Sequence, residues 1–341
     1  MSAEQDNLHP FEDGPRDRPA SPAPAHAAPG SFVPEPEIFA QVIPDPTAPA
    51  SPEDTAEIDL SAVEAKLNDP GSTQSFEPIA DDLIDTDATF DAGTSSTLMW
   101  GARSDVGCVR SHNEDSYLAA SPLFCVCDGM GGVNGGRIAA RIATDTMQQY
   151  FARHMKALQP GMEKTFIMRG FDITNRAVYE KSTSDPEMQG MGTTGVCAYA
   201  SRGMAHVVHA GDSRAYLFHA GGLRQITRDH SMVQQLVDSG QITREQAAVH
   251  PQKNLITRAL GVSANIVPEY NRCEIEAGDI LLLCTDGLTN MVADDDIAQV
   301  LREVPFFDAT SILVDRALQA GGQDNITVLL MGVEATEVNN G

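Results

Sequence analysis

No part of this 341-residue sequence is apolar over the ~20 consecutive residues that a membrane-spanning helix needs. Residues 1–6 are acidic and lack the basic-then-apolar order of a secretory signal peptide. Basic residues are scarce, since 23 lysines and arginines stand against 48 aspartates and glutamates, and they form no basic stripe. Such an acidic chain is not attracted to nucleic acid or to anionic membranes. These absences predict a cytoplasmic protein with neither nucleic acid nor membrane as a partner.

The six cysteines include no C-x-x-C pair. Most of them lie in apolar runs, which favours small buried side chains over disulfide bridges or zinc ligands. A reducing compartment is the simplest fit to this pattern.

Residues 1–96 contain most of the 20 prolines, none of the cysteines and a large excess of acidic residues. A segment of this composition buries too little apolar surface to offset the entropy lost on ordering, so we expect a disordered extension. The folded unit is expected over 97–334, a size that suits one domain, followed by a short tail over 335–341.

The simplest interpretation of the extension is a solubilising segment. A weaker alternative rests on the acidic run at 81–91, which contains Thr86 and Thr89. Phosphorylation of these threonines would create a docking site for a phosphothreonine-binding partner.

Short apolar or alternating segments bounded by Gly, Asp or Asn predict strands near 98–102, 116–127, 193–200, 204–210, 214–218, 280–284 and 326–333. Helical spacing of apolar residues predicts helices near 136–158, 162–182, 229–239 and 308–320. Because the strands cluster and do not alternate strictly with helices, the pattern favours an α+β architecture of packed antiparallel sheets flanked by helices.

Acidic residues stand at the ends of several expected strands. Asp128, Asp212 and Asp286 each directly follow an apolar run, and Asp324 lies in a glycine-rich loop before the last strand. A single Asp-Gly pair is usually only a turn. Carboxylates gathered at strand ends instead form an oxygen-only cage that suits Mg²⁺ or Mn²⁺, and Gly129 leaves its carbonyl free to reach a cation.

The segment 107–116 brings Arg110, Glu114 and Asp115 within a few residues of one another. An arginine offers a planar fork of donors that fits a phosphate group. The alternative for this segment alone is a surface loop held by salt bridges.

These motifs together resemble the PPM family, the metal-dependent type 2C serine/threonine protein phosphatases, in its bacterial form. The resemblance covers 97–334 and rests on segments in the family's order: 110–115, 126–132, 190–194, 209–214, 226–230, 250–252, 283–288 and 322–325. It implies an αββα sandwich with a two-metal centre in the cleft between the sheets. Residues 227–258 correspond to the family's flap beside the active site, which we expect to govern substrate access.

The resemblance also implies roles for individual residues. Asp128 would bridge two Mn²⁺ or Mg²⁺ ions, the Gly129 carbonyl would bind one of them, and Asp286 and Asp324 would complete the other. Glu114 and Asp115 would orient water held by the ions, and Arg110 would clamp the substrate phosphate. A third ion would draw on Asp212 and Asp286.

Two departures from the family pattern affect this chemistry. Met130 stands where eukaryotic members have a histidine assigned as general acid, and a thioether cannot donate a proton; His112 is a weak substitute. Asn290 stands where many relatives have an aspartate, which weakens the attraction for a third ion.

The sequence therefore predicts hydrolysis of phosphoserine or phosphothreonine on proteins by water activated between two metals, opposing a bacterial Ser/Thr kinase. No cysteine lies in a C-x₅-R loop, so a cysteine-dependent phosphatase is excluded. Two alternatives stay open. One is a non-catalytic phosphoprotein-binding scaffold, which would not need the complete metal cage, and the other is an enzyme of the same fold in a partner-switching pathway.

Overall fold

The computed structural model describes residues 88–95, 97–131 and 135–334, all within one compact unit, Ala80–Gly341. Most of the extension expected over 1–96, including Thr86, lies outside the described residues, as does the tail expected over 335–341.

One sheet has six antiparallel strands. Its spatial order is β1 (Ala88–Thr94), β2 (Leu98–Asp105), β12 (Ile326–Val333), β11 (Ile280–Cys284), β8 (Arg214–His219) and β9 (Gly222–Gln225). The central strands β11 and β12 are almost wholly apolar, as expected for strands buried on both faces.

The second sheet is also antiparallel. Its order is β10 (Glu269–Glu274), β7 (Met204–Ala210), β6 (Gly195–Ser201), β4 (Leu123–Met130) and β3 (Asp115–Ala120), and the short β5 (Gly192–Thr193) pairs with the end of β4. The apolar segment expected as one strand over 116–127 is a hairpin, because the chain turns at Ser121-Pro122 between β3 and β4.

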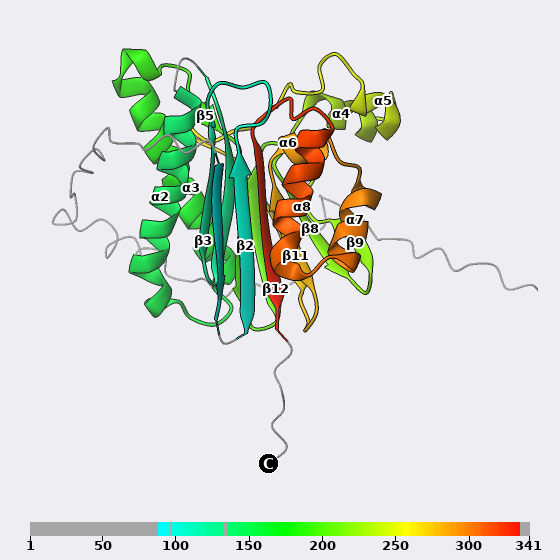
Figure 1. The fold of residues 1–341 in the computed structure, drawn as a ribbon. Helices are drawn as coiled ribbons and strands as arrows, with labels where there is room; N and C mark the ends of the chain where they lie inside the picture. The colour runs from blue at the N-terminus through cyan, green and yellow to red at the C-terminus, as the bar shows by residue number, and fades with distance from the viewer. Residues whose placement is uncertain (1–87, 96, 132–134, 335–341) are drawn as a thin grey trace, which may run out of the picture. The chain divides into compact units, whose positions relative to one another are not determined.

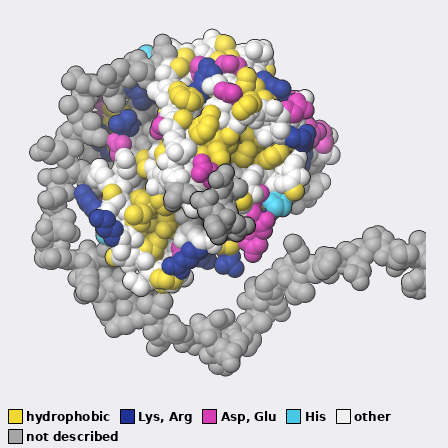
Figure 2. Space-filling model, turned by 60° about the horizontal axis from the view of Figure 1, so that its bottom comes forward, with side chains coloured by type: hydrophobic (Ala, Val, Ile, Leu, Met, Phe, Trp, Pro, Cys, Tyr) yellow, Lys and Arg dark blue, Asp and Glu magenta, His cyan; other side chains and the backbone are white. Residues whose placement is uncertain are grey.

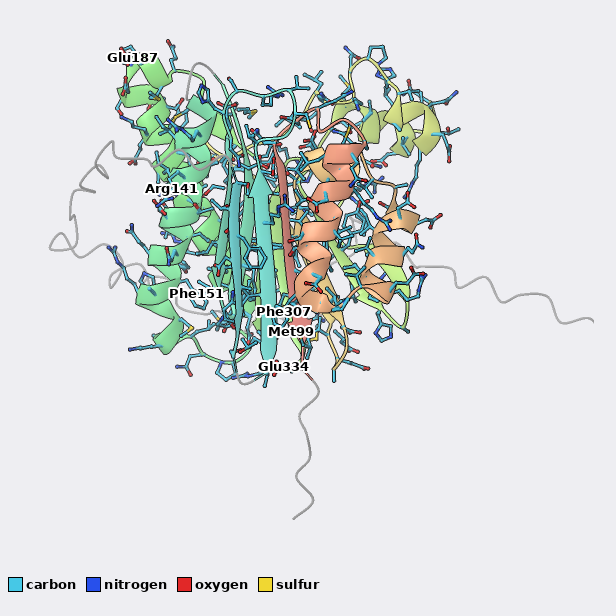
Figure 3. All side chains as sticks on the ribbon, viewed as in Figure 1. Met99, Arg141, Phe151, Glu187, Phe307 and Glu334 are labelled. Atoms are coloured by element: carbon cyan, nitrogen blue, oxygen red, sulfur yellow. A yellow bond between two sulfur atoms is a disulfide. The ribbon has the colours of Figure 1, made fainter. Side chains whose placement is uncertain are left out.

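Helices cover the outer face of each sheet (Figure 1). Helices α2 (Gly135–His154) and α3 (Glu163–Ser184) lie on the β3–β4 side. Phe151 of α2 faces the core and packs edge-on against Phe166 and Tyr199. Arg141 on the same helix (Figure 3) is exposed and pairs with Asp145. Helices α6 (Asp286–Thr289), α7 (Asp294–Glu303) and α8 (Phe306–Gln319) lie on the other side. Three apolar cores fill the layers, one between the sheets and one under each helix layer. The expected αββα sandwich is confirmed.

The sheet begins earlier than the expected boundary at Thr97. Strand β1 pairs with β2 along its whole length, from Ala88 opposite Asp105 to Thr94 opposite Met99. Its side chains alternate between exposed and half-buried, as on an edge strand, and its Asp, Gly and Thr content resembles that of the acidic extension. Thr89 therefore belongs to a paired strand, so the expectation that residues 88–95 are part of a disordered extension was wrong. Docking of a partner through Thr89 stays a prediction.

The sequence also gave no signal for β9, β10 or α7. Strand β10 is an edge strand in which Cys273 is the buried member. Helix α7 begins with three aspartates, Asp294–Asp296, which suit the positive end of a helix.

Two cysteines contradict the expectation that none is bridged. Cys125 of β4 and Cys197 of β6 are directly opposite each other in the sheet, 4.1 Å apart between Cα atoms, and form a disulfide. The spacing of 72 residues hides this pairing, because only the strand register makes them neighbours. The inference of a reducing compartment from unpaired cysteines loses its basis.

Within the described residues, no helix is long and apolar enough to cross a membrane. On the face of the molecule shown in Figure 2, the described basic side chains are scattered among acidic and apolar ones and do not gather into a stripe. The cytoplasmic location expected from the sequence stays a prediction.

Candidate metal centre

The acidic residues singled out in the sequence meet at one end of the sandwich. Asp128 lies near the end of β4, opposite Asp115 of β3. Asp286 begins α6 directly after β11, and Asp324 precedes the neighbouring strand β12. Asp212 follows β7. Both sheets thus contribute carboxylates to the same place.

Asp115 is held firmly from the opposite sheet. Its Oδ2 accepts hydrogen bonds from Thr327 Oγ1 at 2.6 Å and from Thr285 Oγ1 at 3.0 Å. Its Oδ1 is buried and has no hydrogen-bond partner in the protein. Burial raises the pKa of Asp115 to about 7, although the two hydroxyl groups act in the opposite direction. One oxygen is therefore fixed and the other is left for a ligand.

The remaining carboxyl groups perturb one another. Burial, with the charges of Asp115 and Asp286, raises the pKa of Asp128 well above its ordinary value. Burial and the charge of Asp286 raise the pKa of Asp212 to about 8. Burial and the charge of Asp324 raise the pKa of Asp286 to about 6. Arg214 and Lys253 attract these carboxylates but do not offset their burial and mutual repulsion, so further positive charge would stabilise the ionised forms.

The donor set fits a hard divalent cation. Asp286 Oδ1, like Asp115 Oδ1, is buried without a protein partner. The converging ligand atoms are carboxylate oxygens, with no thiolate or imidazole in the cluster, which suits Mg²⁺ or Mn²⁺ and not zinc. A bound cation would also supply the missing positive charge.

The backbone around Asp128 is fixed by threonines to which the sequence assigned no role. The Asp128 N–H donates to Thr194 Oγ1 at 3.0 Å, and Thr193 Oγ1 donates to the Asp128 carbonyl at 2.8 Å. Thr194 also shares a 2.7 Å hydrogen bond with Ser213, which adjoins Asp212. The segment 190–194 was recognised only through the family resemblance, and its function is to hold this part of β4.

Gly129 is required by a close approach of two backbones. A Cβ at this position would overlap the backbone of Gly136 at the start of α2. The Gly129 N–H donates to the Glu114 carbonyl at 3.2 Å. A side chain here would therefore separate α2 from the candidate centre.

Arg110 reaches the cluster from the loop before β3. Its Nη2 is 2.7 Å from Asp324 Oδ2, and the arginine side chain is 52% exposed. That hydrogen bond is the main reason why the pKa of Arg110 is raised. The ion pair joins Arg110 to a carboxylate of the cluster, and the phosphate-binding role of Arg110 stays a prediction.

Asn325 places Glu114 beside this ion pair. The Asn325 side chain accepts a hydrogen bond from the Glu114 N–H at 2.8 Å and donates to the carbonyls of Val106 and His112. Burial raises the pKa of Glu114. Asn325 was known only as part of the 322–325 motif, and its position shows that it organises the loop that carries Arg110 and Glu114.

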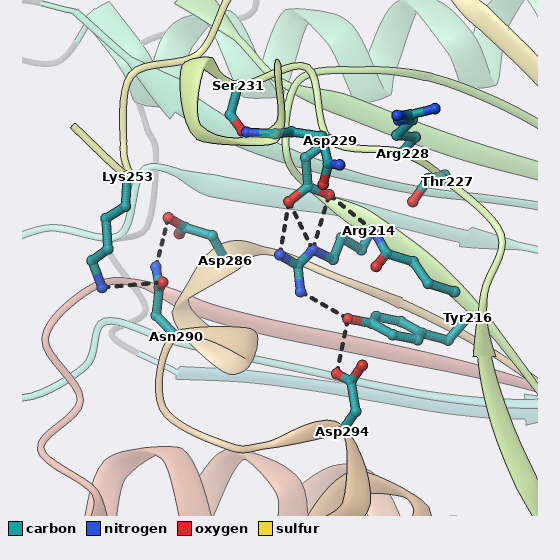
Figure 4. A network of polar contacts seen from close by, with 12 residues as sticks. Arg214, Tyr216, Thr227, Arg228, Asp229, Ser231, Lys253, Asp286, Asn290 and Asp294 are labelled. Carbon is teal, nitrogen blue, oxygen red and sulfur yellow. Dashed lines mark hydrogen bonds and ion pairs between the residues drawn. The ribbon is translucent and has the colours of Figure 1, made fainter. Parts of the chain in front are cut away.

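The segment expected as a flap, 227–258, contains α4 (Met232–Asp238) and α5 (Arg244–Ala248). Ser231 caps α4, and Thr243 forms a capping box with Gln246 at α5. The base of the segment is fixed by Asp229, which accepts hydrogen bonds from Arg214 Nε and Nη2 (Figure 4). A pocket of about 250 Å³ lies between this segment and the metal centre, with Asp212 and Asp286 in its lining.

A second cluster of potential ligands does not have the geometry of a metal site. His209, His230 and Glu269 offer atoms within 4.8 Å of one another. The two imidazole rings, however, are stacked with an 8° angle between their planes. An ion ~2 Å from each nitrogen must lie in both ring planes, which stacked rings do not permit. Arg258 Nη1, 3.1 Å from His230 Nε2, adds a repelling charge.

Comparisons with known proteins agree with this geometry. The family model described as protein phosphatase 2C matches residues 110–328. The serine/threonine protein phosphatase PstP of Mycobacterium tuberculosis (strain ATCC 25618 / H37Rv) is 37% identical over 246 residues, which cover 71% of this chain and 46% of PstP. This chain thus spans about half the length of that relative.

The serine/threonine phosphatase stp of Listeria monocytogenes (serotype 4b, strain F2365) is 34% identical over 241 residues, covering 69% of this chain and 96% of stp. Among solved structures, a match is found to the catalytic domain of PstP in complex with two manganese ions. The two structures superimpose with a TM-score of 0.63 at 36% identity, and the match covers 70% of this chain and 99% of that domain. With its fold, its motifs and these matches, the chain belongs to the protein phosphatase 2C (PPM) family.

Proposed function

We propose that this protein is a Mn²⁺- or Mg²⁺-dependent phosphatase that hydrolyses phosphoserine and phosphothreonine on other proteins. The observation that carries the proposal is the convergence of carboxylates from both sheets around Asp128, with buried oxygens of Asp115 and Asp286 that have no protein partner. A non-catalytic scaffold has no physical need for buried, mutually repelling carboxylates beside an arginine.

The ligand assignment is the one that the family resemblance implies. Asp128 would be shared by two ions, the Gly129 carbonyl would bind one, and Asp286 and Asp324 would bind the other. The relative PstP has been crystallised with two manganese ions, which supports this number. When bound, such ions lower the pKa of water and supply a nucleophile for phosphate-ester hydrolysis near neutral pH.

The protein's own groups would orient and neutralise the substrate. Arg110 offers parallel N–H donors to a phosphate, and its exposure leaves it accessible from solvent. Ion binding by Asp324 would compete with the Arg110 ion pair and free the guanidinium for the substrate. Glu114, whose backbone is fixed by Asn325, and Asp115, fixed by two threonine hydroxyls, would orient water.

The partners that fit this activity are phosphorylated proteins, as substrates, and the Ser/Thr kinase that phosphorylates them. The names of the relatives support phosphoprotein substrates, because stp and PstP are both called serine/threonine phosphatases. Docking of a phosphothreonine-binding partner on the N-terminal segment is kept as a proposal for Thr89 and for Thr86, which lies outside the described residues.

The test is release of inorganic phosphate from a phosphothreonine peptide with Mn²⁺ and with EDTA. Asp128→Asn and Asp286→Asn should abolish Mn²⁺-dependent release, whereas Asp172→Asn, which removes an acidic side chain on α3 that pairs with Arg169, should not. Folded, Mn²⁺-loaded protein that releases no phosphate from peptides or phosphoproteins would contradict the proposal and favour a binding protein.

A further inference from the structure

Lys253, in the flap segment 227–258, is connected to the metal centre by a single side chain. Its Nζ donates to Asn290 Oδ1 at 3.2 Å, and Asn290 Nδ2 donates to Asp286 Oδ2 at 2.9 Å (Figure 4). Lys253 follows α5 in the chain, and Asn290 is the C-cap of α6. This relay of Lys253, Asn290 and Asp286 therefore links the flap to a candidate metal ligand.

The asparagine has one orientation that suits both neighbours. Its amide nitrogen faces a carboxylate and its amide oxygen faces an ammonium group; a reversed amide would place donors against donors and acceptors against acceptors. The Asn290 N–H also donates to the Asp286 carbonyl at 2.7 Å, which fixes both residues on one helical turn. Asp286 Oδ2 is thus occupied by an N–H donor.

All members of the relay face the same space. Lys253, Asn290, Asp286 and Asp212 line the pocket of about 250 Å³ beneath the flap. A divalent cation between Asp212 and Asp286 would find an N–H donor on Asp286 Oδ2 and no carboxylate at position 290. Oxygen ligands are what Mg²⁺ and Mn²⁺ require, and an amide nitrogen does not bind them.

Two other cations, Arg214 and Arg244, line this pocket. Arg214 of β8 donates to Asp229 through Nε and Nη2 and to the Tyr216 hydroxyl through Nη1. Lys253 is the flap cation that a single side chain joins to Asp286, and its charge acts on that carboxyl group alongside the charge of Arg214.

We propose that Lys253, held through Asn290, supplies the positive charge beside Asp212 and Asp286 in place of a third divalent ion, and so ties the position of the flap to the metal centre. This inference rests on the proposed function, because it concerns the same centre. In this protein the Lys253 ammonium group on the flap partly neutralises the charge of Asp286, as a weakly bound third divalent ion would otherwise do.

The first test is the number of Mn²⁺ ions bound, measured by isothermal titration calorimetry. Wild-type protein should bind two ions tightly. Asn290→Asp, which replaces the N–H donor by a carboxylate, should bind a third ion at least tenfold more tightly than wild type, and Asn290→Asp with Lys253→Met should bind it more tightly still, because the ammonium no longer competes. A wild-type protein that binds a third ion as tightly as Asn290→Asp would overturn the proposal.

The second test is hydrogen exchange of the flap backbone, which does not depend on turnover. Lys253→Met should speed exchange in residues 244–255 several-fold, and Lys253→Arg should restore much of the protection. Lys181→Met, which breaks an exposed ion pair with Asp185 on α3, is the matched control and should leave the flap unchanged. Unchanged flap exchange in Lys253→Met would contradict the coupling.

Failure of the proposed function would be recognised separately, as wild-type protein that binds two Mn²⁺ ions without hydrolysing the phosphopeptide. The third-ion affinity and the flap exchange would still decide the role of Lys253 in that case.

Discussion

Arg110 and Asp324 form an ion pair of 2.7 Å although they lie 214 positions apart in the sequence. The pair joins the loop before β3 to the loop before β12, one from each sheet. The pair places Arg110, the cationic side chain that the sequence predicted to bind phosphate, against Asp324, a predicted metal ligand. Arg110 Nη2 is therefore free for a phosphate only when Asp324 has another partner.

Arg110→Lys should lower kcat/KM for a phosphothreonine peptide by about 10- to 100-fold. A lysine keeps the charge but loses the fork that binds two phosphate oxygens, and charge-assisted hydrogen bonds are worth roughly 1.5–3 kcal/mol. The loss should appear mainly in KM and should leave Mn²⁺ affinity equal or higher, because Asp324 loses a competitor. Steady-state kinetics and Mn²⁺ titration check both parts, and an unchanged KM would contradict the phosphate role.

Metal-free protein should lose stability as the pH rises from about 6 to 8. The pKa of Asp115 is raised to about 7 and that of Asp212 to about 8, above the ordinary value of ~4 for the unfolded chain. In this range the folded state holds more protons than the unfolded state, so the free energy of unfolding falls with rising pH.

Mn²⁺ competes with those protons and should therefore stabilise more at pH 8 than at pH 6. At one fixed Mn²⁺ concentration, about a hundred times its Kd at pH 8, we expect a rise in Tm of roughly 5–10 °C at pH 8 and a smaller one at pH 6, where protons weaken Mn²⁺ binding. Calorimetry with EDTA or Mn²⁺ measures the difference. An equal shift at both pH values would show that the carboxyl groups are not the ligands.

Asp128→Asn should stabilise the protein in EDTA at pH 8 while abolishing the stabilisation by Mn²⁺. The substitution keeps the shape of the side chain and removes the charge around which the other carboxylates gather. Each pKa unit relieved is worth ~1.4 kcal/mol, so a gain of roughly 1 kcal/mol or more is expected in urea unfolding. A less stable variant that still responds to Mn²⁺ would contradict a central role for Asp128.

Thr327→Val should cost roughly 1–3 kcal/mol of stability because it removes the 2.6 Å hydrogen bond to buried Asp115 and the 2.8 Å hydrogen bond with Ser104. Thr310→Val is the matched control. Thr310 is equally buried, but its hydroxyl has no hydrogen-bond partner, so its replacement should be neutral or stabilising. Urea unfolding of both variants measures the contrast, and equal costs would mean that the Asp115 hydrogen bond contributes little.

The layered fold was predictable because its inner strands, such as β11, are apolar on both faces and end at Asp-containing loops. The edges were not predictable from pattern alone. Strand β1 has no fully buried apolar face, so its sequence does not differ clearly from that of the acidic extension. It forms a strand because it pairs with β2. The Cys125–Cys197 disulfide likewise follows from strand register, which the sequence does not display.

The sequence indicated the carboxylates that the structure brings together, and it missed the residues that support them. Asp128 and Asp286 could be recognised because they follow apolar runs, and Asp324 because its glycine-rich loop precedes one. Thr285 and Thr327 gave no signal, since a threonine in a strand is ordinary until the opposite sheet brings Asp115 to it. The relay from Lys253 through Asn290 depends on how the flap folds back, which no local pattern encodes.

The central claim is that the carboxylates around Asp128 hold two divalent ions. Its most direct test is a crystal structure of the full chain grown with Mn²⁺ and recorded at a wavelength that gives manganese anomalous signal. The account predicts two anomalous peaks, both next to Asp128, one shared with the Gly129 carbonyl and the other with Asp286 and Asp324. No peak at Asp128, or manganese bound only elsewhere, would contradict it.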